Sequence, residues 1–172
     1  MDESGFLLAP LVRTTQAPRG HTPQLEHHAY HDRASVAAAV CLSPQQRHLR
    51  LFWEVFPDTF IDAETYVSFL EDLLGTIAGP VILLQDQAPL HYGEAMEEFR
   101  EDYPRLSLEE FPAYAPELNP VEFLWTHLKA QELANYAPEN LEELVHTLCI
   151  KLGQAHGQAR LRSFLRGSDL TW

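Results

Sequence analysis

The run ASVAAAVCL, residues 34–42, is the sequence feature that most limits the possible folds. It is almost entirely apolar, which is typical of a β-strand that is covered on both of its faces. The run is far too short to cross a bilayer, because a membrane-spanning helix needs about 20 apolar residues. A strand covered on both sides requires other elements above and below its sheet, so we expect an α/β protein with helices on both faces of the sheet.

The spacing of apolar residues predicts the elements around this strand. Strands are expected near residues 4–13 and over residues 48–55, 81–86 and 106–111, and the segment SPQQ at 43–46 predicts a hairpin turn. Three strands followed by alternating helices and strands imply a mixed sheet of five strands, which fits a ribonuclease H-like architecture. The helices are expected over residues 62–78 (capped by Asp62), 94–102, 119–133 and 138–164.

Composition limits the class of protein. The 172 residues predict one domain, and 45% hydrophobic with 22% charged residues is typical of a folded globular chain. The acidic N-terminus lacks the features of a secretory signal, so we expect a soluble cytoplasmic protein. Two cysteines, Cys41 and Cys149, are expected to be buried thiols rather than a disulfide. The net charge of −13 argues against general affinity for nucleic acid, because phosphate binding depends on Lys and Arg.

Three acidic residues lie where predicted elements begin or end: Asp2, Asp86 and Glu122. Each has an ordinary explanation, since Asp2 fits a solvated terminus, Asp86 a turn, and Glu122 a capping box with Asn119. Alternatively, carboxylates from separate elements converge where strands end and hold two divalent cations for in-line displacement at a phosphodiester. Carboxylate oxygens suit Mg²⁺ or Mn²⁺ better than zinc. These residues alone leave both interpretations open.

Four segments together resemble the catalytic domain of mariner-type bacterial insertion-sequence transposases, which belong to the DDE superfamily of endonucleases. The resemblance extends from Asp2 to about residue 135 and continues more weakly to the final residues 167–172. The pairing of the last two segments is highly specific, and Asp86 and Glu122 stand 36 positions apart, close to the spacing typical of the family. The segments are DESGF (2–6), APRGHTP (17–23), VILLQDQAPLH (81–91) and FPAYAPELNPVEFLW (111–125).

The resemblance implies that Asp2, Asp86 and Glu122 are the metal-binding triad of an enzyme that cleaves and joins DNA strands with two Mg²⁺ or Mn²⁺ ions. His91 matches the histidine of the second motif, which implies an auxiliary role beside the metal site or the DNA phosphate. Two further matches, Asn119 and Trp125, are explained sufficiently by helix capping and by core packing. Gln87 stands where relatives usually have Asn, so a longer side chain must make any hydrogen bond of that amide.

The resemblance also implies that residues 1–172 form the catalytic domain of a DNA transposition enzyme that acts at the bacterial nucleoid on transposon ends and target DNA. Related proteins continue upstream of Asp2 through the rest of the first strand and a basic helix-turn-helix region. We expect an upstream or separate polypeptide to supply this DNA-binding region. Its Lys and Arg residues would then bind the DNA, so the net negative charge of this chain would not exclude a DNA-processing function. We also expect a homodimer when active and no membrane partner.

Two alternative functions stay open. The chain can be an inactive or truncated transposase relict that acts as an interaction module, or a metal-dependent nuclease that does not join strands. Other candidate sites are weaker: His27, His28 and His31 fit a polar loop better than a metal site, since no cysteine lies nearby. The arginines near the C-terminus fit solvated helix charges better than a DNA contact.

Overall fold

The computed structural model describes residues 1–25, 32–43, 45 and 48–170. Within these residues, no helix is both long enough and apolar enough to span a membrane. The strands are β1 (Asp2–Leu7), β2 (Arg33–Leu42), β3 (Leu49–Pro57), β4 (Val81–Gln85) and β5 (Leu106–Glu110). The helices are α1 (Ala63–Thr76), η1 (Pro89–His91), α2 (Glu94–Asp102), η2 (Pro116–Leu118), α3 (Pro120–His127), η3 (Leu128–Glu132), α4 (Leu141–Ala155) and α5 (Gln158–Gly167).

The strands pair in two groups. β1, β2 and β3 form an antiparallel sheet with β2 in the middle, and Asp2 lies opposite Ala38 in its register. β4 and β5 pair in parallel. The single five-stranded sheet predicted from the sequence is therefore not confirmed. A hydrogen bond connects the two groups, because the Met1 amino group donates to the Leu84 carbonyl of β4 across 2.6 Å.

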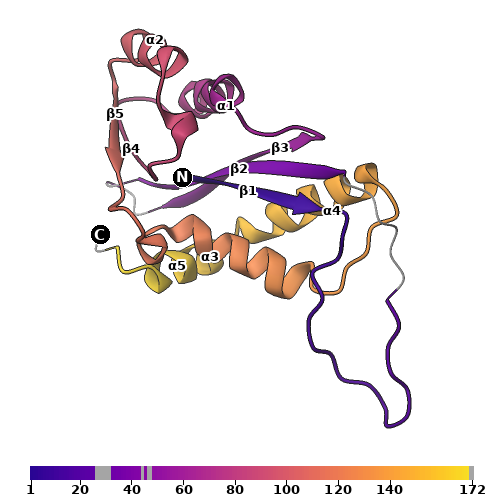
Figure 1. Ribbon diagram of the computed structural model, residues 1–172. Helices are drawn as coiled ribbons and strands as arrows, with labels where there is room; N and C mark the ends of the chain where they lie inside the picture. Colours follow the sequence, from indigo (N-terminus) through magenta and orange to yellow (C-terminus); the bar gives the residue numbers. More distant parts are fainter. Residues whose placement is uncertain (26–31, 44, 46–47, 171–172) are drawn as a thin grey trace.

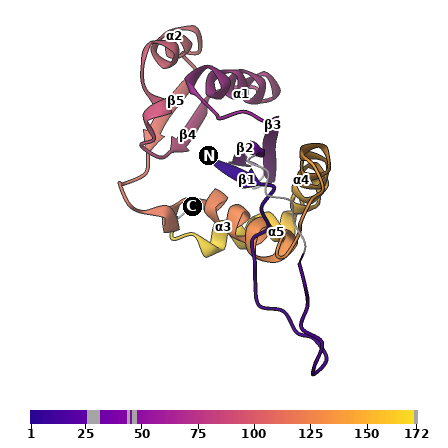
Figure 2. The ribbon, with the colours of Figure 1, turned by 45° about the vertical axis from the view of Figure 1, so that its right-hand side comes forward.

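Helices cover both faces of the antiparallel sheet. α1 and α2 lie on one side of it, and α3, α4 and α5 lie on the other (Figures 1 and 2). The side chains of β2 alternate accordingly: Ala37 and Ala39 enter one buried cluster, while Ala34, Val36 and Ala38 enter the other. The expectation of a strand covered on both faces, and of a mixed α/β fold, is confirmed.

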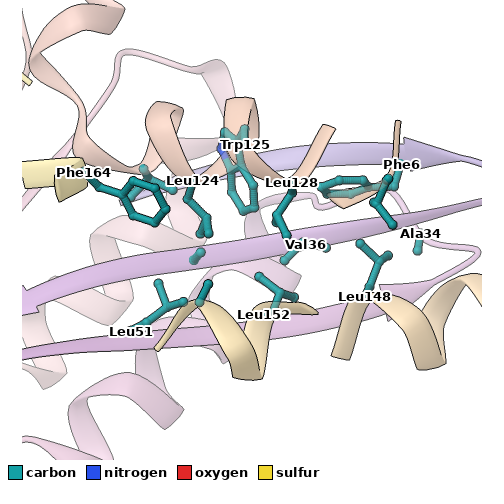
Figure 3. Close-up of a cluster of buried hydrophobic side chains, with 14 of the residues drawn as sticks. Phe6, Ala34, Val36, Leu51, Leu124, Trp125, Leu128, Leu148, Leu152 and Phe164 are labelled. Carbon is teal, nitrogen blue, oxygen red and sulfur yellow. The ribbon is translucent and has the colours of Figure 1, made fainter. Parts of the chain in front are cut away.

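The larger core cluster lies between the sheet and helices α3 to α5. Figure 3 shows Leu124 and Trp125 of α3, and Leu128 at the start of η3, packed toward the sheet residues Val36 and Leu51. α4 adds Leu148 and Leu152, and α5 adds Phe164, from the same side of the sheet. Because α3 inserts its apolar stripe into this core, the first turn of α3 is fixed relative to β1.

The helix predicted over residues 138–164 is wrong as a single element. α4 ends at Ala155, and Gly157 adopts an extended backbone (φ −63°, ψ 134°) as the N-cap of α5. The apolar stripe that begins at Leu141 does not continue in phase through the break, because Leu161 lies about half a turn away from the face of Leu152 at ~3.6 residues per turn. This change of phase is the signal that the prediction of one helix overlooked. The predicted helix over residues 119–133 is α3 followed by η3, a π-helical turn.

Other predicted boundaries are closer to those observed. Asp62 caps α1 by accepting a hydrogen bond from the Thr65 N–H, as expected. The first strand begins at Asp2 rather than at residue 4 and ends at Leu7, before Pro10. The two cysteines are free and half-buried. The histidines at positions 27, 28 and 31, and positions 44 and 46 of the predicted SPQQ turn, lie outside the described residues.

Candidate active site

The three acids predicted from the sequence line one pocket, which we call the acidic pocket. Asp2 comes from the start of β1, Asp86 from the residue after β4, and Glu122 from the first turn of α3. The pocket has a volume of about 400 Å³ and is bordered by the segment between β5 and α3. Its remaining lining residues are Gln87, Ala88, Phe111, Pro112, Ala113, Tyr114, Ala115, Pro116 and Asn119.

Asp2 is the most deeply buried of the three acids, with 7% of its surface exposed. Its Oδ2 accepts a hydrogen bond of 3.0 Å from the indole Nε1 of Trp125, and its Oδ1 accepts one of 3.0 Å from the Glu3 N–H. The pKa of Asp2 is raised to about 7, chiefly by burial and then by the neighbouring charges of Glu122 and Glu3, against the hydrogen bond from Trp125. A solvated terminal position, the ordinary explanation for Asp2, is therefore wrong.

Asp86 lies at the carboxyl end of β4 and keeps half of its side chain exposed (52%). Its Oδ1 accepts a hydrogen bond of 3.0 Å from the Ala88 N–H, which is the turn geometry expected of Asp. The Nδ1 atom of His91 lies 3.2 Å from the same oxygen. Asp86 thus makes a turn and also faces the acidic pocket, so its two interpretations are compatible.

His91 is buried behind Asp86, with 4% of its surface exposed, and does not line the acidic pocket. Its Nδ1 donates to the Asp86 carbonyl at 2.8 Å, its Nε2 lies 3.3 Å from a carboxylate oxygen of Glu3, and its ring packs against Tyr66. Burial lowers the pKa of His91, but the hydrogen bonds to Glu3 and Asp86 outweigh burial and raise it. His91 therefore joins the end of β4 to β1.

Glu122 stands in the first turn of α3, behind the cap that the sequence predicts. The Asn119 side chain accepts a hydrogen bond from the Val121 N–H, and Pro120 occupies the first helical position. The capping-box explanation for Glu122 requires the Asn119 N–H as donor, but that group donates to the Pro116 carbonyl at 3.0 Å. The Glu122 side chain instead lines the acidic pocket.

α3 and the following η3 carry two further residues toward β1. Trp125 of α3 and Lys129 of η3 follow Glu122 at helical spacing, and Lys129 donates a hydrogen bond of 2.7 Å to the Ser4 hydroxyl. Burial lowers the pKa of Lys129, and the charges of Glu122 and Asp2 oppose this effect. The sequence interpretation gave Trp125 only a packing role and did not single out Lys129. Their positions three and seven residues after Glu122 are the signal that could have indicated both.

The Gln87 side chain makes a hydrogen bond to the segment after β5. Its Nε2 donates to the Phe111 carbonyl at 3.2 Å, and the Phe111 N–H donates to the Gln85 carbonyl at 2.8 Å. These two bonds attach the segment after β5 to the end of β4. The longer amide therefore fixes the wall of the acidic pocket.

The donor chemistry of the acidic pocket fits a hard divalent cation. Its acids are carboxylates, and neither cysteine lines it. Burial beside other acids disfavours the charged form of Asp2, and a bound cation would relieve that repulsion. Among the residues that the structure describes, no three His, Cys, Asp or Glu side chains are already close enough to hold an ion together.

Comparisons with known structures find proteins of similar fold. The fold resembles the Mos1 transposase paired-end complex with left transposon end (TM-score 0.68, 20% identity, covering 97% of this chain and 49% of that one). It also resembles the Mos1 mariner paired-end complex with Mn (TM-score 0.67, 19% identity, covering 96% of this chain and 49% of that one). A third similar structure is the catalytic domain of Mos1 mariner transposase (TM-score 0.62, 17% identity, covering 96% of this chain and 72% of that one). The chain thus spans about half the length of the transposases in those complexes.

The comparison with curated protein sequences finds no significant match. The family model described as DDE superfamily endonuclease matches residues 1–145, which is most of the chain and includes all three acids of the acidic pocket. The chain belongs to the DDE superfamily endonuclease family.

Proposed function

We propose that residues 1–172 are the catalytic domain of a transposase that cleaves DNA strands at transposon ends and transfers them to target DNA. The observation that carries this proposal is the meeting of Asp2, Asp86 and Glu122, from three separate elements, in one pocket. Family membership and the fold shared with the Mos1 catalytic domain support it. The contact between Met1 and Leu84 supports placing β1 beside β4, as in one five-stranded sheet.

In this proposal the three carboxylates would hold two Mg²⁺ or Mn²⁺ ions. Such ions, when bound, supply the positive charge that in-line displacement at a phosphodiester requires. The exposed Asp86 side chain can change rotamer toward an ion without disturbing the core, whereas Asp2 is fixed by its two hydrogen bonds. Trp125 orients Asp2, and His91 orients Asp86 through its carboxylate and its carbonyl.

The expected partners follow from charge. A chain with a net charge of −13 attracts DNA weakly, so we propose that a basic DNA-binding polypeptide brings the transposon ends to the acidic pocket. We further propose a homodimer as the active form, because the Mos1 structures of similar fold are paired-end complexes. We also propose action at the nucleoid in the cytoplasm.

The test is nicking of a supercoiled plasmid in the presence of Mn²⁺. Asp86→Asn and Glu122→Gln should each lower the nicking rate by about 10²-fold or more, because each removes a carboxylate that would hold the cations, and losing even an outer partner of a metal ligand costs about 10- to 100-fold. Glu98→Gln is the matched control, since Glu98 is an exposed acid of α2 outside the acidic pocket, and it should nick like the parent chain. A rate that is unchanged in Asp86→Asn would refute the proposal. Joined products separate a transposase from a nuclease that only cleaves.

One observation favours a second candidate, an inactive interaction module. Both carboxylate oxygens of Asp2 already accept hydrogen bonds from the protein, which leaves fewer lone pairs for a cation. This second function is correct if the folded chain binds a full-length transposase but does not nick DNA at any Mn²⁺ concentration.

A further inference from the structure

The segment between β5 and α3, residues 111–119, is held firmly at both ends. At its start, Phe111 is buried and is bonded to Gln85 and Gln87 at the end of β4. At its end, the Asn119 side chain caps α3 and also donates to the Met1 carbonyl. In Figure 1 this segment joins β5 to α3 on the side where the first residue of β1 begins. We call it the β5–α3 loop.

Tyr114 stands in the middle of the β5–α3 loop and is 100% exposed. It is also one of the residues that line the acidic pocket. Burial normally stabilises an aromatic ring, and this ring gains none of that stabilisation from the folded chain. Both faces of the phenol ring are therefore available to a ligand at the border of the acidic pocket.

The backbone of Tyr114 is held in an unfavourable conformation. Its φ is +61°, in the left-handed region, which bulky residues rarely adopt. The other described residues with positive φ, glycine aside, are Asp58 and Asn135, types that tolerate this region. Strain of this kind persists where the surrounding structure enforces it, and it is concentrated at functional sites. The anchored ends of the β5–α3 loop provide that enforcement.

We propose that Tyr114 is a stacking platform for an unpaired nucleobase next to the phosphodiester in the acidic pocket. This inference rests on the proposed function, because it assumes that DNA enters the pocket. A flat base needs an open aromatic face of its own size, and aromatic stacking binds single-stranded bases of any sequence. Stacking would hold a strand end in place while its phosphate faces Asp2, Asp86 and Glu122.

The surroundings of Tyr114 favour a base over a protein partner. The ring is flanked by two small residues, Ala113 and Ala115, and then by Pro112 and Pro116. An aromatic anchor in a protein interface needs neighbouring side chains that exclude water around it, and alanines provide little such cover. The same small neighbours leave room for a base and its sugar on both sides of the ring.

The test measures binding without cleavage. The full chain is titrated, in Ca²⁺, onto a forked oligonucleotide with 2-aminopurine at the first unpaired position, and fluorescence and affinity are recorded. The parent chain should quench the fluorescence by stacking. Tyr114→Ala should lose the quenching and bind about 5- to 150-fold more weakly, whereas Tyr114→Trp should keep both. Tyr92→Ala is the matched control, because Tyr92 is half-exposed, lies outside the acidic pocket and donates to Glu110.

An abasic probe completes the experiment. If Tyr114 stacks on a base, the parent chain and Tyr114→Ala should bind a fork that lacks this base equally well. The inference is overturned if Tyr114→Ala binds the base-bearing fork as tightly as the parent, if the parent does not bind it, or if the variant changes only self-association in sedimentation. Plasmid nicking by the parent chain is measured in parallel, so that a failure of stacking is distinguished from a failure of the proposed function.

Discussion

The indole Nε1 of Trp125 donates a hydrogen bond to Oδ2 of Asp2 across 3.0 Å, between residues 123 positions apart in the chain. The bond joins α3, which carries Glu122, to the start of β1. Trp125 also packs edge-on against Phe6 of the same strand, with ring centroids 6.0 Å apart. One side chain therefore contributes to the hydrophobic core and orients an acid of the acidic pocket.

Trp125→Phe should destabilise the fold by about 1–3 kcal/mol, because it leaves a buried carboxylate oxygen without its donor. The measurement is urea denaturation at pH 7. Trp53→Phe is the control for the loss of indole volume, since Trp53 packs against the same cluster from β3. Equal losses in the two variants would show that the bond to Asp2 contributes nothing to stability.

Stability should fall as pH rises between about 4 and 7 through Asp2. The pKa of Asp2 is about 7 in the folded chain and 3.8 in the unfolded chain, so the folded state keeps a proton that the unfolded state releases. The loss reaches at most about 4 kcal/mol, at 1.36 kcal/mol for each pKa unit. Asp2→Asn should lack this slope and be more stable than the parent at pH 8 in EDTA. A parent chain whose stability relative to Asp2→Asn does not change from pH 4 to 8 would contradict the shift.

Mn²⁺ should raise the melting temperature of the parent chain. A ligand at 100 times its Kd stabilises the folded state by about 2.7 kcal/mol, which corresponds to about 5–11 °C for a chain of this size. The double variant Asp86→Asn, Glu122→Gln should lose most of this shift, whereas Glu98→Gln should keep it. Differential scanning fluorimetry with and without Mn²⁺ provides the measurement. An undiminished shift in the double variant would place the ion elsewhere.

Two glycines in helices should respond in opposite directions to alanine. A Cβ at Gly153 in α4 meets no atom within 4 Å, so Gly153→Ala should stabilise the fold by about 0.5–1 kcal/mol through helix propensity. A Cβ at Gly167 would lie 2.9 Å from the Phe123 ring, so Gly167→Ala should destabilise by about 1–3 kcal/mol through overpacking. Thermal and urea unfolding of both variants measure this difference, and the same sign for both would contradict the packing of α5 on α3.

Local signals in the sequence were sufficient for much of the fold. The Asp62 cap, the Asn119 and Pro120 pair and the apolar run at 34–42 each depend on near neighbours or on burial, and each is confirmed. The prediction of one helix over 138–164 did not include the break at Gly157, because it rests on the stripe that ends at Leu152 and does not test whether Leu161 and Phe164 continue it in phase. The division of the strands was missed because the composition of a strand does not determine which edges pair.

The acids of the acidic pocket were found because they lie in recognisable motifs at the ends of elements. Their surroundings were harder to predict, since they depend on contacts between distant segments. Glu3 contacts His91 on one face of β1, and Trp125 reaches Asp2 on the other. Tyr114 is distinguished only by its exposure and its backbone angle, and neither property can be read from the sequence.

The residues that line the acidic pocket come from elements of two different hydrophobic clusters. Asp86 follows β4, which packs with α1 and α2, whereas Glu122 lies on α3, which packs in the opposite cluster. The β5–α3 loop connects the two sides. A small rotation of one cluster against the other would widen or narrow the gap between these carboxylates while leaving each core intact. Under the proposed function, the affinity of the acidic pocket for a cation would depend on how these two layers pack against each other, and crosslinking the layers should change that affinity without altering any of the three carboxylates.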